Sequence, residues 1–339
     1  MKVSNQKVTA KAQKFKAEEI FGIKSSSEFR ELALKAFYLQ AAECIPYREY
    51  LENLDCDPCK VTSVEEIPFL PVAIFKTKKV ITGRGAVEKF FKSSSTTGMT
   101  PSVHPVTDLS LYDQSLSLGF RLRYGDPSGY AIVALLPSYL ERGDSSLVYM
   151  TEQLMKESGR AENGFYLYNH SELYDKLTDL RNRNIRSILI GVSFALVDFA
   201  LKYKMDFPEL IVMETGGMKN SSRELSREEI HRIISEGFGV KRVHSEYGMA
   251  ELLSQAYSCG DGLFTTPPWM KVAIRDLNNP FKLLPYGKRG GINIIDLANI
   301  NSCCFIETGD LGVKTAGNYF EVSGRIKQSE LRGCNLLLE

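Results

Sequence analysis

Residues 187–213 decide the fold of this chain and read SILIGVSFALVDFALKYKMDFPELIVM. Two short apolar runs of strand length, 187–190 and 210–213, enclose a segment of helical length and composition at 194–203. Apolar runs without alternation are typical of strands that are covered on both faces, as in parallel sheets with helices on each side. The stretch therefore predicts a strand, a helix and a second, parallel strand.

The same alternation extends outward from this unit in both directions. The further elements that we expect are strands at 131–136 and 164–168, and helices at 147–157 and about 173–180. The capping box Ser226-x-x-Glu229 opens another helix, which Gly237 and Gly239 are expected to end. We predict an α/β fold with a doubly wound, mostly parallel sheet that carries helices on both faces.

The two ends of the chain have different patterns. The first sixty residues are expected to be helical, Pro68 and Pro71 then stop any helix, and a β-rich stretch to about residue 91 follows. After about residue 260 the sequence changes to short extended runs with many glycines. The predicted units are therefore 1–260, N-terminal helices plus an α/β nucleotide-binding body, and 261–339, a β-rich subdomain with a short C-terminal tail.

Composition places the chain among ordinary soluble globular proteins. It has 339 residues, of which 43% are hydrophobic and 24% charged, with a net charge of +1. So small a net charge gives no general attraction to nucleic acid, and no apolar run is long enough to span a membrane. Seven cysteines without an apolar leader indicate reduced thiols. We therefore expect a cytoplasmic protein with no nucleic-acid partner.

Four separate motifs carry groups that suit a nucleotide. The Ser- and Thr-rich loop Ser93–Pro101 can surround a phosphate, and Glu246–Glu251 offers a carboxylate for Mg²⁺ beside an aromatic ring for a base. The carboxylate of Thr308-Gly309-Asp310 can accept hydrogen bonds from ribose hydroxyls, and Gly324-Arg325 offers a cation. Each motif by itself is also an ordinary turn, so the order of all four is the informative feature.

That order resembles the adenylate-forming superfamily, in particular its phenylacetate–CoA ligase branch. The chain is more similar still to the acyl-protein synthetases of bacterial luminescence systems. The closer resemblance rests on Ile67–Pro71 with Phe75-Lys76, on residues 136–142, and on the ending Gly324-Arg325 followed by 329–334. It covers nearly the whole chain.

The resemblance implies ATP-dependent activation of a carboxylic, in particular a fatty, acid to an acyl-adenylate, followed by transfer to a protein thiol. ATP and Mg²⁺ are the implied cofactors, and an acyl-reductase or an acyl-carrier protein is an implied partner. The implied catalytic residues are Cys334 as the acyl acceptor, Glu251 as the Mg²⁺ ligand and Arg325 at the ribose–phosphate edge. The implied nucleotide contacts are Ser94, Ser95, Thr96, Thr97 and Gly98 for phosphates, Tyr247 with Gly216 and Gly217 for adenine, and Asp310 for ribose.

Typical members continue past Gly-Arg into a mobile lid domain, whereas this sequence ends soon after Arg325, so we expect the lid to be missing. Three positions depart from the family pattern. Ser95 stands at a usual glycine, Met99 at a usual basic residue and Ala250 at a usual threonine. A non-catalytic nucleotide- or acyl-binding homologue is therefore one alternative, and an acyl- or aryl-CoA ligase is another.

A serine hydrolase is the alternative from another enzyme class. Ser193 lies between an apolar strand and a helix, in the context of a nucleophile elbow, and His231 and His244 follow it in the sequence. However, Ala195 stands where the motif has glycine, and no HGGG-type segment is present. An ordinary strand-to-helix turn is the interpretation that we prefer.

Overall fold

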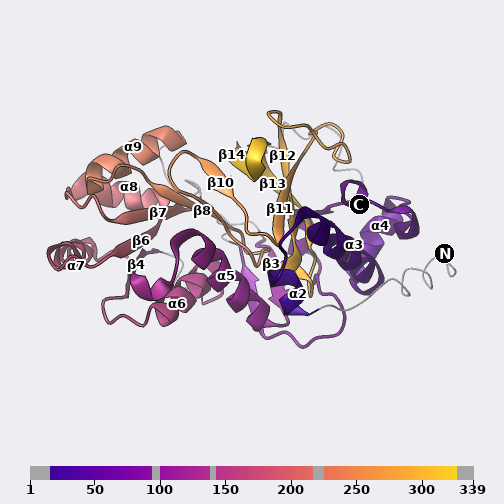
Figure 1. The fold of residues 1–339 in the computed structure, drawn as a ribbon, viewed down its shortest axis with the longest axis horizontal. Helices are drawn as coiled ribbons and strands as arrows, with labels where there is room; N and C mark the ends of the chain where they lie inside the picture. Colours follow the sequence, from indigo (N-terminus) through magenta and orange to yellow (C-terminus); the bar gives the residue numbers. More distant parts are fainter. Residues whose placement is uncertain (1–15, 94–99, 138–142, 217–224, 327–339) are drawn as a thin grey trace.

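A large mixed sheet with helices on its faces organises the computed structural model, which describes residues 16–93, 100–137, 143–216 and 225–326 (Figure 1). The helices are α2 (Ala17–Phe21), α3 (Ser26–Glu43), α4 (Ile45–Asn53), α5 (Leu109–Tyr124), α6 (Ser146–Ser158), α7 (His170–Asn182), α8 (Ser193–Lys202) and α9 (Arg227–Phe238). The strands up to the middle of the chain are β1 (Leu70–Pro71), β2 (Lys89–Lys92), β3 (Val103–Val106), β4 (Ala131–Leu135), β5 (Gly164–Tyr166), β6 (Ser187–Val192), β7 (Ile211–Thr215) and β8 (His244–Tyr247). The later strands are β9 (Ala256–Ser258), β10 (Leu263–Thr265), β11 (Met270–Arg275), β12 (Arg289–Asp296), β13 (Phe305–Lys314) and β14 (Tyr319–Arg325).

The sheet is parallel in one half and antiparallel in the other. Its order is β11-β12-β13-β14-β10-β9-β8-β7-β6-β4-β5, and β1 pairs with β13. Neighbouring strands from β5 to β8 are parallel. From β9 onward, every neighbour on this path is antiparallel. Since β9 pairs with β10, the sheet continues past residue 260, and the change of sequence pattern there marks a change of strand direction. The division into units 1–260 and 261–339 stays a prediction.

The parallel half is doubly wound, as the apolar runs predicted. In β6, Ile188 and Ile190 lie in the hydrophobic cluster that also contains residues of α5 and α6. Leu189, between them in sequence, lies in a second cluster with residues of α7, α8 and α9. Because successive strand side chains point to opposite faces, this division shows that helices cover both faces. The expectation of an α/β body with N-terminal helices and a β-rich C-terminal part is therefore confirmed.

Helix α9 begins as the sequence predicts but ends differently. Ser226 Oγ accepts a hydrogen bond from the Glu229 amide at 3.2 Å, and the Glu229 carboxylate accepts one from the Ser226 amide at 2.7 Å. Gly239, with φ +69°, caps the C-terminus in the left-handed conformation. Gly237 lies inside the helix, so its predicted role as a terminator is wrong. A Cβ there would come within 2.5 Å of Ala200 Cβ, so this glycine allows α9 to pack closely against α8.

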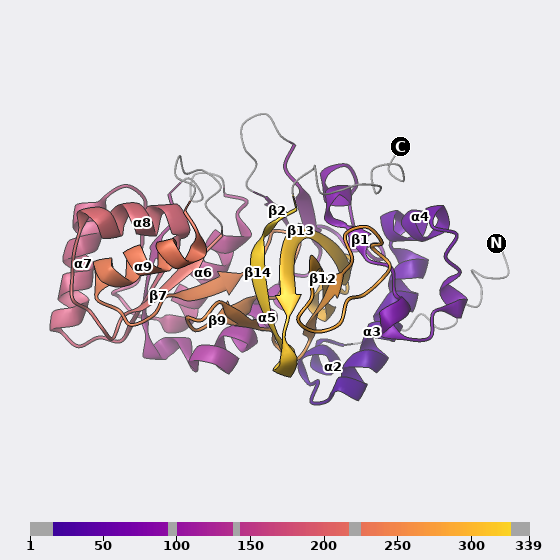
Figure 2. The same cartoon turned by 90° about the horizontal axis from the view of Figure 1, so that it is seen from above.

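The N-terminal helices pack against the C-terminal part of the sheet. Gln40 of α3 is completely buried, and its Nε2 donates to the carbonyls of Asn299 and Ile300 at 3.2 and 3.1 Å. Its Oε1 accepts from the Cys304 amide at 2.9 Å. In Figure 2, α3 and α4 lie beside β12 and β13. After β1 the chain forms a 3₁₀ helix (Val72–Lys76), and the next strand is β2, which begins at Lys89. The β-rich stretch predicted up to about residue 91 is therefore wrong over most of its length.

Candidate active site

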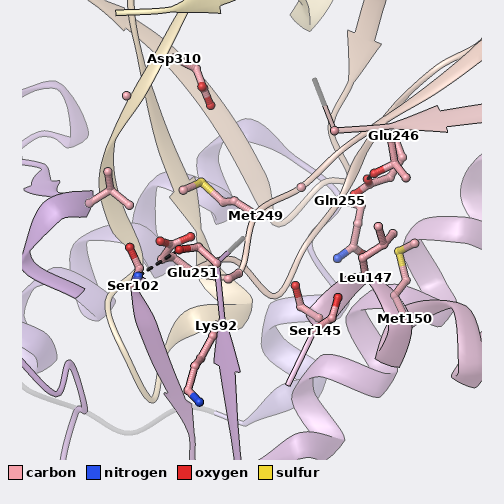
Figure 3. Close-up of a pocket in the computed structure, with 18 of the residues that line it drawn as sticks. Lys92, Ser102, Ser145, Leu147, Met150, Glu246, Met249, Glu251, Gln255 and Asp310 are labelled. Atoms are coloured by element: carbon pink, nitrogen blue, oxygen red, sulfur yellow. Dashed lines mark hydrogen bonds between the residues drawn. The ribbon is translucent and has the colours of Figure 1, made fainter. Parts of the chain in front are cut away.

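A cavity of about 470 Å³ opens where the parallel half of the sheet meets the antiparallel half. Thr215 and Gly216, at the carboxyl end of β7, contribute to its wall, and the loop after β8 contributes residues 248–251 and Gln255. The turn in β13 and the end of β14 complete the opposite side (Figure 3). Ligands of open α/β sheets bind beyond the carboxyl ends of parallel strands, so this cavity has the expected place for a site.

Four of the site residues that the resemblance implies line this one cavity. They are Gly216, Glu251, Asp310 and Arg325. They come from three segments that are far apart in the sequence, the end of β7, the loop after β8 and the β13–β14 hairpin. Figure 3 shows the carboxyl groups of Glu251 and Asp310 on the same side of the cavity. The fold therefore brings together groups that the sequence only lists in order.

Tyr247 is not among the residues that line the cavity in the described part of the chain. Its ring packs against Phe264 and Phe320, with centroid distances of 5.9 and 5.7 Å, and its hydroxyl donates to Asp310 Oδ2 at 2.9 Å. Burial and the neighbouring Asp310 carboxylate raise the pKa of this hydroxyl, so it remains a donor. A contact between Tyr247 and adenine stays a prediction. In the structure, Tyr247 positions the carboxylate of Asp310.

Several predicted contacts lie outside the described residues, namely Ser94, Ser95, Thr96, Thr97, Gly98, Gly217 and Cys334. The residues on either side of the Ser/Thr/Gly loop are described. Ser93, Thr100 and Ser102 line the cavity, and the Ser102 amide donates to Ser93 Oγ at 3.0 Å. The two ends of the loop therefore meet at the cavity wall.

Asp310 is held by a hydrogen bond at one carboxylate oxygen and by an ion pair at the other. Tyr247 contacts Oδ2, and Arg325 Nε lies 3.4 Å from Oδ1. Asp310 and Arg325 face each other across the β13–β14 pair, which fixes their spacing. The Arg325 side chain is 65% exposed, so its guanidinium can also reach a ligand. A carboxylate oriented in this way retains lone pairs that can accept hydrogen bonds from vicinal hydroxyls.

The loop that carries Glu251 has no regular structure, yet it is buried, and Glu251 itself is 3% exposed. Side chains from distant segments satisfy its backbone. His104 Nδ1 donates to the Ala250 carbonyl at 2.8 Å, and Asn299 Nδ2 donates to the Glu251 carbonyl at 2.8 Å. Asp296 Oδ2 accepts from the amides of Leu253 and Ser254 at 2.9 and 3.0 Å. These contacts fix the position of the Glu251 backbone. No local sequence motif predicts them.

The sequence assigns no role of their own to three further groups at the site, Glu246, Lys92 and Lys76. Glu246 lines the cavity and is 8% exposed, and its Oε2 accepts a hydrogen bond from Thr215 Oγ1. Burial raises the pKa of Glu246 to about 7, and the charge of Glu214 acts in the same direction. Lys92 also lines the cavity, where it is paired with Asp144 at 2.8 Å, and Lys76 is a further lining residue. These lysines bring positive charge to a site that lacks the usual basic residue at position 99.

Ser193 has the contacts of a buried turn residue. It is 2% exposed, and its Oγ lies 2.6 Å from both Glu214 Oε2 and the Gly216 carbonyl. His231 Nε2 lies 3.7 Å from Glu214 Oε1, so the carboxylate stands between the serine and the histidine. In a catalytic triad the histidine must stand between the other two. Ser193 is the first residue of α8, and the strand-to-helix turn is the interpretation that this geometry supports.

Comparison with known proteins identifies relatives that match most of the chain. No family model matches the sequence. The chain is 24% identical over 314 residues to the long-chain-fatty-acid–luciferin-component ligase of Vibrio harveyi, covering 86% of this chain and 82% of that protein. A ligase of the same description from Aliivibrio fischeri is 22% identical, and the match covers 93% of this chain.

Solved structures show the same fold at lower sequence identity. ATP-bound MatB from Rhodopseudomonas palustris gives a TM-score of 0.52 at 20% identity; the match covers 71% of this chain but only about half, 49%, of MatB. A 2-hydroxyisobutyryl-CoA ligase in complex with 2-HIB-AMP and CoA gives 0.63 at 15% identity, covering 89% of this chain and 70% of that enzyme. None of the helices in the described part of the chain combines the length and apolar composition that crossing a membrane requires. The chain is thus similar over most of its length to the acyl-protein (luciferin-component) ligases, and its fold is that of the adenylate-forming enzymes.

Proposed function

We propose that this chain uses ATP to activate a carboxylic acid, a fatty acid in the first instance, as an acyl-adenylate. The observation that carries the proposal is the convergence of Gly216, Glu251, Asp310 and Arg325 on one cavity, in a chain with the adenylate-forming fold. The similarity to long-chain-fatty-acid–luciferin-component ligases supports the fatty acid as substrate class.

In the reaction, a carboxylate oxygen of the acid attacks the α-phosphorus of ATP. A phosphorus–oxygen bond to the acid forms, the bond to the bridging oxygen breaks, and pyrophosphate leaves with that electron pair. Asp310 would orient the ribose, and Arg325, Lys76 and Lys92 would offset the phosphate charge. The carboxylate of Glu251 is a hard oxygen donor that fits Mg²⁺, which would neutralise charge on the departing phosphates.

Exchange of labelled pyrophosphate into ATP tests this proposal, because the exchange requires reversible formation of the adenylate. We expect exchange to depend on an added acid, in a panel that varies chain length from short to long. A calorimetric measurement of ATP binding under the same conditions serves as the control. Binding of ATP without exchange on any acid would instead identify a non-catalytic homologue, and absence of both would contradict the nucleotide site.

We further propose that the acyl group passes from the adenylate to Cys334. The support is the resemblance together with reach along the chain, since Cys334 lies nine positions after Arg325, which lines the cavity. Nine residues span at most about 30 Å when extended. Attack by a thiolate on the adenylate carbonyl would form a thioester and release AMP. The alternative acceptor is coenzyme A, as in an acyl- or aryl-CoA ligase.

Incubation with MgATP and a labelled acid should give an adduct on the wild-type protein that hydroxylamine removes. The Cys334→Ala variant should lose this label completely, because the accepting sulfur is gone. Cys259→Ala is the matched control, since Cys259 is a partly exposed cysteine outside the cavity lining, and it should keep the label. Full labelling of Cys334→Ala would show that another group of the protein accepts the acyl chain. Rapid release of acyl-CoA when coenzyme A is added, without any protein adduct, would favour the CoA ligase.

A further inference from the structure

The cavity has a second polar end, opposite the one formed by Asp310. Figure 3 shows Glu246 and Gln255 together at this end, next to Leu147 and Met150 of α6, and away from Asp310. Glu246 belongs to β8, and Gln255 ends the loop that follows it. We refer to Glu246 and Gln255 as the acceptor pair.

Both members of the acceptor pair are buried, and Gln255 is incompletely satisfied. Glu246 is 8% exposed, and its Oε2 accepts the Thr215 hydroxyl. Gln255 is 5% exposed, and its Oε1 has no hydrogen-bond partner among the described residues. Tyr257, directly opposite Glu246 on β9, has a buried hydroxyl in the same condition. Buried polar atoms are normally hydrogen-bonded, so the unsatisfied oxygen of Gln255, a residue of the cavity wall, indicates a ligand that completes it.

The backbone leaves room for this arrangement. A Cβ at Gly248 would lie 2.4 Å from Glu246 Oε1 and 3.6 Å from Gln255 Cγ, so any side chain at this position would displace the carboxyl group. The two distances also show that the side chains of Glu246 and Gln255 both lie beside Gly248. The lack of a side chain at Gly248 therefore leaves the space that the Glu246 carboxyl occupies. A plain alkyl wall would need no such opening.

Resting on the proposed function, we infer that the activated acid carries a hydrogen-bond donor on its acyl chain, a hydroxyl or an amino group, which Glu246 and Gln255 accept. An unsubstituted alkyl chain would leave these oxygens without the hydrogen bond that a donor on the acyl chain can supply. Sites built to hydrogen-bond a substrate group reject the analogue that lacks it. Leu147 and Met150 supply apolar surface beside the acceptor pair for the methylene part of the chain.

Pyrophosphate exchange with matched acids tests the inference. Each acid is compared with derivatives of the same length that carry a hydroxyl or an amino group at successive positions. For the wild type, kcat/KM for the best substituted acid should exceed that for its plain counterpart by about tenfold or more. The Glu246→Leu variant should reverse this preference, because leucine removes the acceptor and favours alkyl contact.

Two further variants keep the test decisive. Glu246→Gln retains an acceptor oxygen but no charge, so it should keep a hydroxyl preference and lose an amino preference. Gln255→Leu should reduce the preference even if Glu246→Leu fails to fold, which thermal unfolding will reveal. A wild type that prefers the plain acid, or a preference that stays unchanged in both Glu246→Leu and Gln255→Leu, overturns the inference while the proposed function stands. Absence of exchange with every acid overturns the proposed function and this inference with it.

Discussion

Replacement of Asp310 by alanine is expected to weaken ATP binding by about ten- to a hundredfold. Asp310 lines the cavity, and its carboxylate is oriented by Tyr247 at 2.9 Å and Arg325 at 3.4 Å. A hydrogen bond to a charged group contributes about 1.5–3 kcal/mol, and each 1.4 kcal/mol is about a tenfold change in affinity. Isothermal titration calorimetry with ATP, without added acid, measures the change directly.

Tyr247→Phe is the matched control for this variant. It keeps the ring against Phe264 and Phe320 but removes the hydroxyl that orients the carboxylate. We expect an intermediate loss, of about tenfold or less, because Asp310 keeps Arg325. Wild-type affinity in Asp310→Ala would show that this carboxylate does not hold the ribose.

Replacement of Glu251 by glutamine is expected to reduce pyrophosphate exchange by about a hundredfold or more. The change preserves size but removes the charge of the only carboxylate that the proposed function assigns to Mg²⁺, and loss of charge stabilisation at a reacting phosphate costs several kcal/mol. Exchange measured against Mg²⁺ concentration should show a much higher half-saturation in the variant. Chelation of Mg²⁺ with EDTA should abolish exchange in the wild type.

The Glu246→Gln variant tests whether the effect of Glu251→Gln on Mg²⁺ dependence is specific or follows from any loss of negative charge in the cavity. Glu246 lines the same cavity as Glu251, but it lies at the opposite polar end (Figure 3). Its neutralisation should leave the dependence on Mg²⁺ unchanged. If Glu251→Gln and the wild type show the same Mg²⁺ dependence, Glu251 is not the metal ligand.

The sequence predicted the body of the fold because its signals are local. The apolar run Ile188, Leu189, Ile190 indicates that both faces of its strand are buried. The structure places these side chains in two hydrophobic clusters. Ser226 and Glu229 form the capping box that their spacing implies. Gly237 was misassigned because glycine can end a helix or allow two helices to approach, and only the position of Ala200 decides between these roles.

The site was predictable only where a motif and a resemblance coincided. Asp310 and Arg325 belong to recognisable motifs, and the structure brings both to the cavity. His104 and Asp296 were missed because each acts on the Glu251 loop from a remote segment, at a separation that no local pattern reports. Glu246 was quoted as part of a motif, yet its place in the cavity wall depends on the direction of its strand.

The buried amide of Gln40 has a consequence for how the chain is made. Its hydrogen-bond partners lie about 260 residues further along, so the ribosome releases α3 long before residues 299–304 exist. Until then, Phe29, Phe37 and the other apolar residues of this helix have no sheet to cover, and surface of this kind favours aggregation. Contacts over such separations also slow folding, because the loop between them must close first. The α3 layer is therefore made long before the strands that it covers, and its apolar face stays exposed on the nascent chain until residues 299–304 have been synthesised.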